Sequence, residues 1–172
     1  MRCIVQRVLS ASVTVDGALV SSIGPGLCVL VGIAETDTPK DFDSMAGKLV
    51  NLRLFDSLDG ATPWALGVGQ RTGEILLVSQ FTLCHVLKGN KLDFHRAMKT
   101  ERARKAFDDF VALVGGKYDR SKVKTGAFGE MMKVDIANDG PVTCVLDYPQ
   151  TPPNPNALPS ASQAPLGGEV EE

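Results

Sequence analysis

An unbroken apolar run, LCVLVGI at residues 27–33, follows the turn signal Gly24-Pro25-Gly26. A strand that faces water on one side alternates apolar and polar residues, whereas a strand buried on both faces is continuously apolar. The run therefore predicts a central strand of the fold, and the flanking segments are expected to pair with it or cover it.

The sequence before this run alternates apolar and polar residues with the period of a half-buried strand. Residues 2–8 and 11–15 are predicted to form two strands. Asp16-Gly17 is a hairpin signal, because the central positions of a two-residue turn need residues that accept positive φ. A further strand, residues 18–22, is expected to follow the turn.

The sequence after the run carries the signals of a helix start. Thr38 is a predicted N-cap, Pro39 occupies the first helical position, and Asp41 lies three residues after the cap. Apolar residues then recur at helical spacing, which predicts an amphipathic helix over residues 39–50. A short strand at 51–55 and a loop at 56–73 are expected next.

The second half of the sequence is predicted to contain, in order, a strand at 74–80, a basic loop at 84–99, a helix from Thr100 closed by Gly115-Gly116, and strands at 131–137 and 142–148 joined by residues 138–141. Strands outnumber helices, and their order is not a regular strand–helix alternation. The predicted fold class is α+β, with a mostly antiparallel or mixed sheet that curls toward a barrel and two main helices.

The composition divides the chain into a domain and a tail. Residues 149–172 carry six of the ten prolines and few large apolar side chains, so they are predicted to form a disordered Pro-rich tail. The folded domain is expected at 1–148. The N-terminus is too polar for a signal peptide, and no stretch reaches the ~20 apolar residues that cross a bilayer. The four cysteines are interpreted as reduced core residues, so a cytoplasmic protein is expected.

The charge distribution leaves two interpretations open. Residues 88–105 and 117–124 are rich in Lys and Arg, while three of the 20 acidic residues lie at 169–172. A polyanion could bind these basic segments through phosphate contacts. A solvated helix face gives the same pattern.

Several catalytic motifs are missing from the sequence. It contains no GxSxG elbow, no P-loop and no HExxH, and neither a metal site nor a cofactor site is predicted. Cys84 beside His85 suggests a thiol hydrolase. Adjacent residues in an extended segment point to opposite sides, so only His95 could approach the thiol.

Two polar segments remain, SQFTL at 79–83 and NDGPVT at 138–143. The first ends a predicted buried strand and could present hydroxyls, an amide and backbone N–H groups to a cleft. The second is expected to lie in a hairpin connection. Taken alone, each is more commonly a strand end or a plain turn.

Together these segments resemble the two signature motifs of the D-aminoacyl-tRNA deacylase (D-tyrosyl-tRNA deacylase) family, eukaryotic type. The resemblance also covers MRCIVQRVLSASVTVDG, IGPGLCVLVGI, LKGNKLDFHRAM and TGAFGEMMKV, in the expected order. One local departure is Glu130-Met131 after Phe128-Gly129, where the family often has a small residue. That departure concerns the pocket wall near Phe128.

The resemblance implies a homodimeric hydrolase that cleaves the ester of D-aminoacyl-tRNA, spares L-aminoacyl groups, and accepts glycine mischarged on tRNA. Gly140 and Pro141 are implied to form a cis dipeptide that enters the partner's pocket and blocks an L side chain. A wall at Cα can separate enantiomers, whereas an apolar pocket cannot, because the two hands have the same volume and polarity.

The remaining site roles also follow from the resemblance. Backbone N–H groups of Phe81 and Thr82 would hold the oxyanion. Ser79 and Gln80 would anchor the terminal adenosine or orient the pocket. A nucleophilic Thr82 would need a neighbouring base, so attack by water assisted by the ribose 2′-hydroxyl is favoured, with Thr82 as support. The other substrate-binding residues implied are Phe128, Met132 and Asn138. The alternative function is a catalytically silent nucleic-acid-binding or scaffolding homologue.

Overall fold

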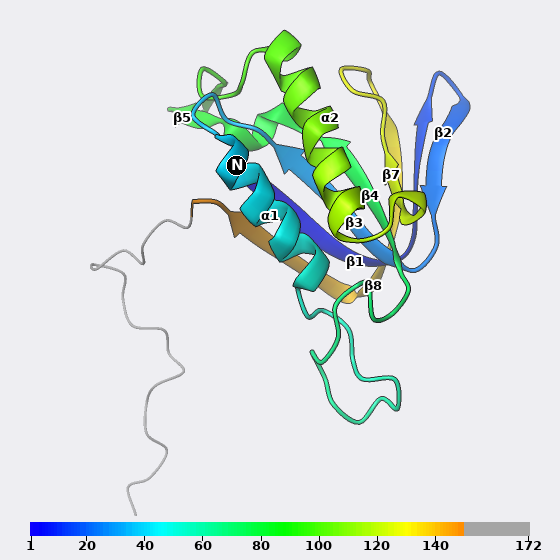
Figure 1. Ribbon diagram of the computed structural model, residues 1–172. Coiled ribbons are helices and arrows are strands. Elements are labelled where there is room, and N and C mark those ends of the chain that lie inside the picture. The colour runs from blue at the N-terminus through cyan, green and yellow to red at the C-terminus, as the bar shows by residue number, and fades with distance from the viewer. Residues whose placement is uncertain (150–172) are drawn as a thin grey trace, which may run out of the picture.

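A computed structural model describes residues 1–149, and from residue 150 onward the predicted tail lies outside the described residues. The elements are β1 (Arg2–Val15), β2 (Ala18–Ile23), β3 (Gly26–Gly32), α1 (Pro39–Asn51), β4 (Glu74–Ser79), the 3₁₀ turn η1 (Phe81–Cys84), β5 (Val86–Lys88), β6 (Lys91–Asp93), α2 (Thr100–Lys117), the 3₁₀ turn η2 (Arg120–Lys122), β7 (Val123–Thr125) and β8 (Lys133–Asp147) (Figure 1).

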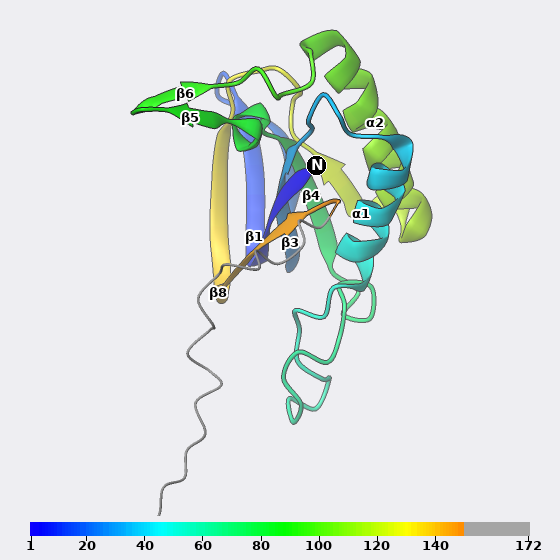
Figure 2. The ribbon, with the colours of Figure 1, turned by 90° about the vertical axis from the view of Figure 1, so that its left-hand side faces the viewer.

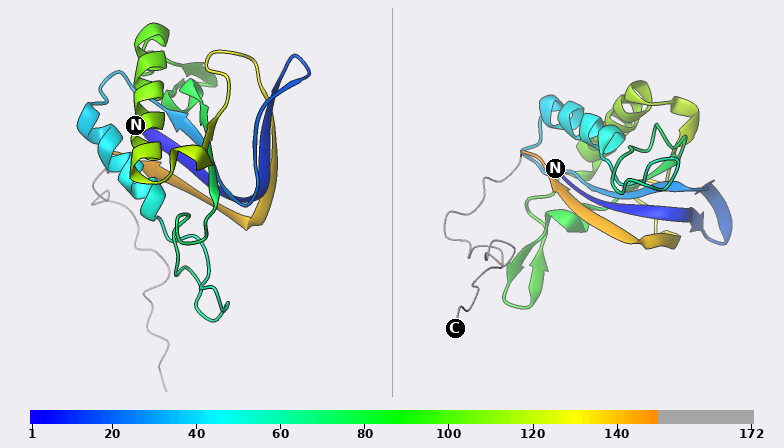
Figure 3. Two further views of the ribbon diagram at one scale, coloured as in Figure 1. Left: turned by 45° about the vertical axis from the view of Figure 1, so that its right-hand side comes forward. Right: turned by 90° about the horizontal axis from the view of Figure 1, so that it is seen from below.

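The main sheet has the order β2-β1-β3-β4-β7. Strand β8 lies off this path and pairs with β1 along nearly its whole length. The β3–β4 and β4–β7 pairs are parallel, whereas the three pairs made by β1 are antiparallel. Helices α1 and α2 cover one face, and the sheet curls on the other (Figures 2 and 3). Ser21 Oγ donates a hydrogen bond of 2.6 Å to the Thr125 carbonyl, which links β2 to β7 and nearly closes the curl. The α+β prediction of a mixed, curling sheet with two helices is confirmed.

Strand β3 is central, as its apolar run predicts. Leu27, Val29 and Val31 face the helices, while Cys28 faces a second cluster inside the curl. All four are at most 1% exposed. Burying a side chain of this size stabilises the fold by roughly 2 kcal/mol, so β3 anchors both halves of the core.

The prediction of two separate N-terminal strands is wrong, because β1 is continuous from Arg2 to Val15. Its register against β8 shifts between Arg7 and Ser10. A bulge adds a residue and displaces the alternation by one, so Val8 and Ala11 both face inward. In the sequence, this break in the apolar–polar alternation resembles the end of one strand and the start of another.

The β1–β2 hairpin and the start of α1 form as predicted. Asp16 and Gly17 have φ of 46° and 81° at the turn. Asp41 Oδ2 accepts hydrogen bonds from Thr38 N–H (2.7 Å) and Thr38 Oγ1 (2.8 Å). Burial alone would raise the pKa of the Asp41 carboxyl, but these two bonds outweigh it and lower the pKa.

The short strand predicted at 51–55 does not form. Asn51 still belongs to α1, and of the other residues only Phe55 makes a bridge, to Leu66 in the following loop. Leu54 and Phe55 are buried in the core beside the helices instead of joining the sheet. Their apolar character therefore reflects burial without strand pairing.

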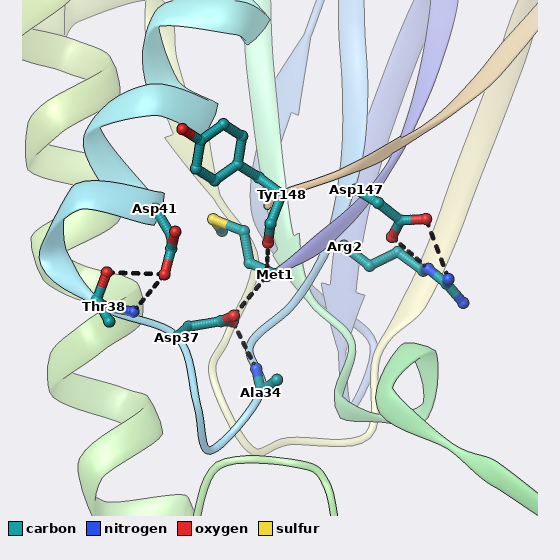
Figure 4. Close-up of polar contacts among 8 residues, drawn as sticks. All are labelled: Met1, Arg2, Ala34, Asp37, Thr38, Asp41, Asp147 and Tyr148. Carbon is teal, nitrogen blue, oxygen red and sulfur yellow. Dashed lines mark hydrogen bonds and ion pairs between the residues drawn. The ribbon is translucent and has the colours of Figure 1, made fainter. Parts of the chain in front are cut away.

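The N-terminus is fixed by a buried polar cluster (Figure 4). The Met1 ammonium donates to Asp37 Oδ1 and to the Tyr148 carbonyl, and Ala34 N–H donates to Asp37 Oδ2 at 2.7 Å. Burial raises the pKa of Asp37, and the hydrogen bond from the ammonium offsets part of that shift. The cluster joins the start of β1, the loop before α1 and the end of β8.

Three predictions for the second half need correction. The basic loop at 84–99 contains the antiparallel hairpin β5–β6. Helix α2 passes through Gly115-Gly116 and ends at Lys117. A Cβ on Gly115 would lie 3.0 Å from the Arg120 side chain, so this glycine allows η2 to pack against the helix. The two last strands are one strand, β8, whose halves pair with the same partner, β1.

Candidate functional site

The segment 79–83 turns sharply at the end of β4. Gln80 N–H donates to the Val31 carbonyl at 2.8 Å, which extends the pairing with β3 by one residue before η1 begins. A Cβ on Gly32 would lie 2.7 Å from Leu83 Cβ and 3.2 Å from the Gln80 carbonyl. Gly32 therefore lets the turn sit directly against the end of the central strand.

The polar groups of this turn bind one another. Gln80 Nε2 donates to Thr82 Oγ1 at 2.6 Å. The Thr82 carbonyl accepts from His85 N–H at 3.2 Å and from the His85 ring at Nδ1, 2.8 Å away. The His85 Nδ1 atom is thus engaged by a backbone carbonyl and does not act on the Thr82 hydroxyl.

The exposed edge of the turn is Phe81, whose side chain is 58% exposed. Its ring meets the Phe94 ring edge to face, with centroids 5.1 Å apart and planes at 71°. Phe94 directly follows β6, so the turn and the β5–β6 hairpin lie together (Figure 2).

The segment 138–143 is not the hairpin connection that the sequence suggests. Val8 pairs with Asn138 and Arg7 pairs with Val142, so residues 139–141 form a bulge in β8. Gly140 has φ of 121°, the Gly140–Pro141 peptide bond is cis, and both residues are exposed. The chain continues along the same partner strand on either side.

Arg7 holds this bulge from the opposite strand. Its Nε donates to the Asp139 carbonyl at 3.3 Å and lies 3.1 Å from Asp139 Oδ2. Its Nη1 donates to the Leu54 carbonyl at 2.6 Å, and its side chain is only 14% exposed. Arg7 was not identified from the sequence. Its long cationic side chain, within a strand of alternating apolar residues, was a signal that could have identified it.

Phe128 lies in the connection from β7 to β8 and is half-buried. Its ring packs on Phe107 with centroids 5.7 Å apart, and the Arg104 guanidinium lies 4.8 Å from its centroid. Met132 fills the inside of this connection, since a Cβ on Gly126 would lie 2.8 Å from its Sδ. Gly126 N–H donates to the Leu77 carbonyl of β4, so the connection starts close to the 79–83 turn.

The turn and the bulge lie apart on the sheet of this chain. Ser79 pairs with Val31, which pairs with Cys3, which pairs with Leu146, whereas the bulge lies opposite Arg7. Four residues of strand correspond to about 13 Å, and three strand spacings separate β4 from β8. The left view of Figure 3 shows β8 bending at the lower edge of the sheet, away from η1.

The thiol arrangement weighed from the sequence does not assemble. Burial raises the pKa of the Cys84 thiol, which favours the unreactive protonated form. His85 points its Nδ1 at the Thr82 carbonyl, and His95 pairs with Asp93 at 2.5 Å. Within residues 1–149, no group of three or more His, Cys, Asp or Glu side chains could hold a metal ion.

A polar turn at the end of a buried strand, a Gly-Pro bulge on a long edge strand and a nearly closed mixed sheet are consistent with the class of hydrolases that the resemblance implies. The family model described as D-Tyr-tRNA(Tyr) deacylase matches residues 4–147. The chain therefore belongs to the D-Tyr-tRNA(Tyr) deacylase family.

Similar proteins agree with this assignment. A D-aminoacyl-tRNA deacylase of Drosophila melanogaster is 51% identical over 150 residues, which cover 87% of this chain and 94% of the relative. The Homo sapiens D-aminoacyl-tRNA deacylase 1 is 48% identical over 149 residues, covering 87% and 71% respectively. A solved structure described as c-Myc DNA Unwinding Element Binding Protein matches with a TM-score of 0.84 at 48% identity, covering 87% of this chain and 100% of that one.

A second solved structure supports the fold alone. It is described as a probable eukaryotic D-amino acid tRNA deacylase and matches with a TM-score of 0.74 at 18% identity, covering 84% of this chain and 97% of that one. In the part of the chain that the structure describes, neither helix is both long and apolar enough to pass through a membrane.

Proposed function

We propose that this chain hydrolyses the ester bond of D-aminoacyl-tRNA and releases the free D-amino acid and tRNA. The observation that carries the proposal is similarity over most of the chain to proteins named D-aminoacyl-tRNA deacylase, at 44–51% identity, with both polar segments present. The catalytic unit is residues 1–148, acting in the cytoplasm.

The turn at 79–83 serves the reaction itself. The aminoacyl ester is already activated, so positioning and an oxyanion site are the main requirements. The N–H groups of Phe81 and Thr82 open the 3₁₀ turn, where no carbonyl of the same turn can accept from them. They are free to bind the oxygen that becomes negative when water attacks.

Thr82 is a supporting residue in this mechanism and not the nucleophile. Its hydroxyl accepts a hydrogen bond from Gln80, and the neighbouring His85 ring is bound to a backbone carbonyl. A hydroxyl without a base in reach is a weak nucleophile. Water attacks instead, and the ribose 2′-hydroxyl of the tRNA assists the proton transfer.

The bulge at 139–141 selects the hand of the amino acid. Gly140 and Pro141 are exposed at its tip and present their carbonyl oxygens to the Cα of the substrate. An L side chain would strike this wall, whereas a D side chain points away from it. Glycine has no side chain, so glycine mischarged on tRNA is also hydrolysed.

The functional unit is a homodimer. The turn and the bulge of one protomer lie apart, three strands and about four residues from each other on its sheet, so the bulge that faces each turn comes from the second copy. Within residues 1–149, β8 pairs only with β1, and Leu9 and Val145 on these strands are 58% and 56% exposed. Both features suit an interface with another copy.

The terminal adenosine of the tRNA binds beside the turn. The half-buried Phe128 ring offers a stacking surface for the base. Met132 supports the connection that carries Phe128, and Ser79 and Gln80 bind the ribose side. Asn138 directly precedes the bulge, so it enters the composite site of the other protomer together with Gly140 and Pro141.

The direct test measures release of amino acid from D-Tyr-tRNA and L-Tyr-tRNA by the purified protein. Hydrolysis of the D form with sparing of the L form is expected. Comparable rates on both would overturn the chiral selection. Binding of tRNA with no hydrolysis would favour the silent nucleic-acid-binding alternative.

A second experiment tests the composite site. A Gln80→Ala/Thr82→Ala variant is impaired in the turn, and a Gly140→Ala variant is impaired in the bulge. A dimer assembled from one protomer of each holds one site in which an intact turn faces an intact bulge. The mixture is expected to be more active than either variant alone, and a mixture with no gain would exclude the shared site.

A further inference from the structure

The loop between α1 and β4 carries Trp64 in a backbone conformation that bulky residues rarely adopt. Its φ is 55°, and its side chain is 53% exposed. A non-glycine residue with positive φ persists only where the surrounding structure determines it. This tryptophan is therefore held in place and is not a loosely placed surface residue.

The backbone around Trp64 forms a small antiparallel ladder. Phe55 N–H donates to the Leu66 carbonyl at 3.1 Å, and the Phe55 carbonyl accepts from both Ala65 and Leu66 at 2.8 Å. One carbonyl that accepts from two successive N–H groups marks an irregularity directly after Trp64. The ladder places Trp64 two residues before Leu66, the bridge partner of Phe55.

Both aromatic rings face one cation. The Arg7 guanidinium lies 6.0 Å from the Phe55 centroid and 5.8 Å from the Trp64 centroid. The same guanidinium binds the Leu54 carbonyl and Asp139 of the bulge. Arg7 thus connects the aromatic loop to the bulge that carries Gly140 and Pro141.

We infer that Trp64 is a positioning residue for chiral selection, because its ring covers Arg7 and so keeps the 139–141 bulge in one place. This inference rests on the proposed function of the bulge. Removing the ring would open the guanidinium to water, and water would then compete for the hydrogen bonds to Asp139. A bulge that moves would no longer reject an L side chain.

The first experiment compares the D:L ratio of kcat/KM for Trp64→Ala with that of the unaltered protein. The ratio is expected to fall about tenfold, the scale of a partly desolvated cation–π contact. Trp64→Phe should recover most of the ratio, because a smaller ring still covers the cation. Leu58→Ala is the matched control in the same loop, since Leu58 is 78% exposed.

The outcomes separate positioning from simple stability. A lower melting temperature with an unchanged D:L ratio would overturn the inference, because the ring would then only stabilise the loop. If the unaltered protein itself fails to discriminate between the two hands, the proposed function fails, and the link between Trp64 and the bulge is then tested by the fluorescence of the Asp139→Ala variant.

That fluorescence experiment needs no activity, because Trp64 is the one tryptophan of the sequence. Asp139→Ala removes the carboxylate partner of Arg7 on the bulge side. The emission maximum of Trp64 and its quenching by iodide are expected to change in this variant. Asp135→Ala, on the same strand but paired with Lys133, is the control and should leave both unchanged. Equal spectra for the two variants would overturn the link between Trp64 and the bulge.

Discussion

The turn at 79–83 and the bulge at 139–141 are held in different ways. The turn rests on contacts with its immediate neighbours: the end of β3 at Gly32 and hydrogen bonds from Gln80 and His85. The bulge projects from an edge strand and is tied down chiefly by Arg7, a residue 132 positions away in the sequence.

This difference separates two properties of the proposed enzyme. Under the proposed function, the turn, which is built into the sheet end, would set the rate for any ester that reaches it. The bulge, which is held by one long side chain, would determine which substrates reach it. Substitutions in the turn should therefore change the rate for both enantiomers in proportion, whereas substitutions in or behind the bulge should change the D:L ratio.

The largest effect is expected for Gly140→Ala. At φ of 121° a side chain is strained, and the new Cβ would lie 2.9 Å from Val142 Cγ2 and 3.3 Å from Arg7 Nη2. The bulge must shift, and a displacement of about 1 Å can cost on the order of 100-fold in activity. We expect a loss of that size on D-aminoacyl-tRNA together with a lower D:L ratio, measured as kcat/KM on both substrates.

Gly17→Ala is the matched control for Gly140→Ala. Gly17 also has positive φ, 81°, but no heavy atom lies within 4 Å of the place that a new Cβ would take. It should cost stability and leave the D:L ratio unchanged. If Gly140→Ala behaves in the same way as Gly17→Ala, the bulge does not select substrates.

A smaller effect is expected for Thr82→Ala in the turn. The substitution removes the hydroxyl that accepts from Gln80 at 2.6 Å, and a hydrogen bond of this kind stabilises by about 1 kcal/mol. The rates on both enantiomers should fall about tenfold or less, with the D:L ratio preserved. Complete loss of activity, with normal folding and tRNA binding, would make Thr82 a covalent participant.

The sequence predicts the turn better than the bulge for a physical reason. The apolar runs of β3 and β4 report burial directly, so the strand end at Ser79 follows from composition. Residues 138–141 have the composition of a hairpin loop, and local preferences do not distinguish a loop from a bulge. Only pairing with β1 on both sides of residues 139–141 does so.

The same limit explains the other corrections. The β1 bulge near Val8 and the buried Phe55 both depend on contacts between segments far apart in the chain. Arg7 and Trp64 were missed for this reason, since neither belongs to a motif. The family resemblance identified Gly140 and Pro141 as candidate site residues, which strand periodicity alone could not do.

A modest effect is expected for Phe94→Ala, which removes the ring that supports Phe81. An edge-to-face pair at this distance stabilises by about 1 kcal/mol, so the turn should loosen without leaving its place on β3. We expect kcat/KM to fall about threefold for both enantiomers. Phe94→Leu keeps an apolar contact and should recover part of the loss. A changed D:L ratio would show that the turn also contributes to selection.

The smallest effect is expected for Cys84→Ala, at the end of the turn. Burial raises the pKa of this thiol, so it is protonated at neutral pH and is a poor nucleophile. The substitution removes only a small, half-buried side chain, and kcat/KM should stay within about twofold of the unaltered protein. Alkylation with iodoacetamide should likewise leave hydrolysis intact.

Loss of activity in Cys84→Ala, with the melting temperature preserved, would restore the thiol mechanism and give the turn a chemical role in place of positioning. Activity retained in both Cys84→Ala and Thr82→Ala would leave the backbone N–H groups as the feature of the turn that serves the reaction, since neither thiol nor hydroxyl would then be required.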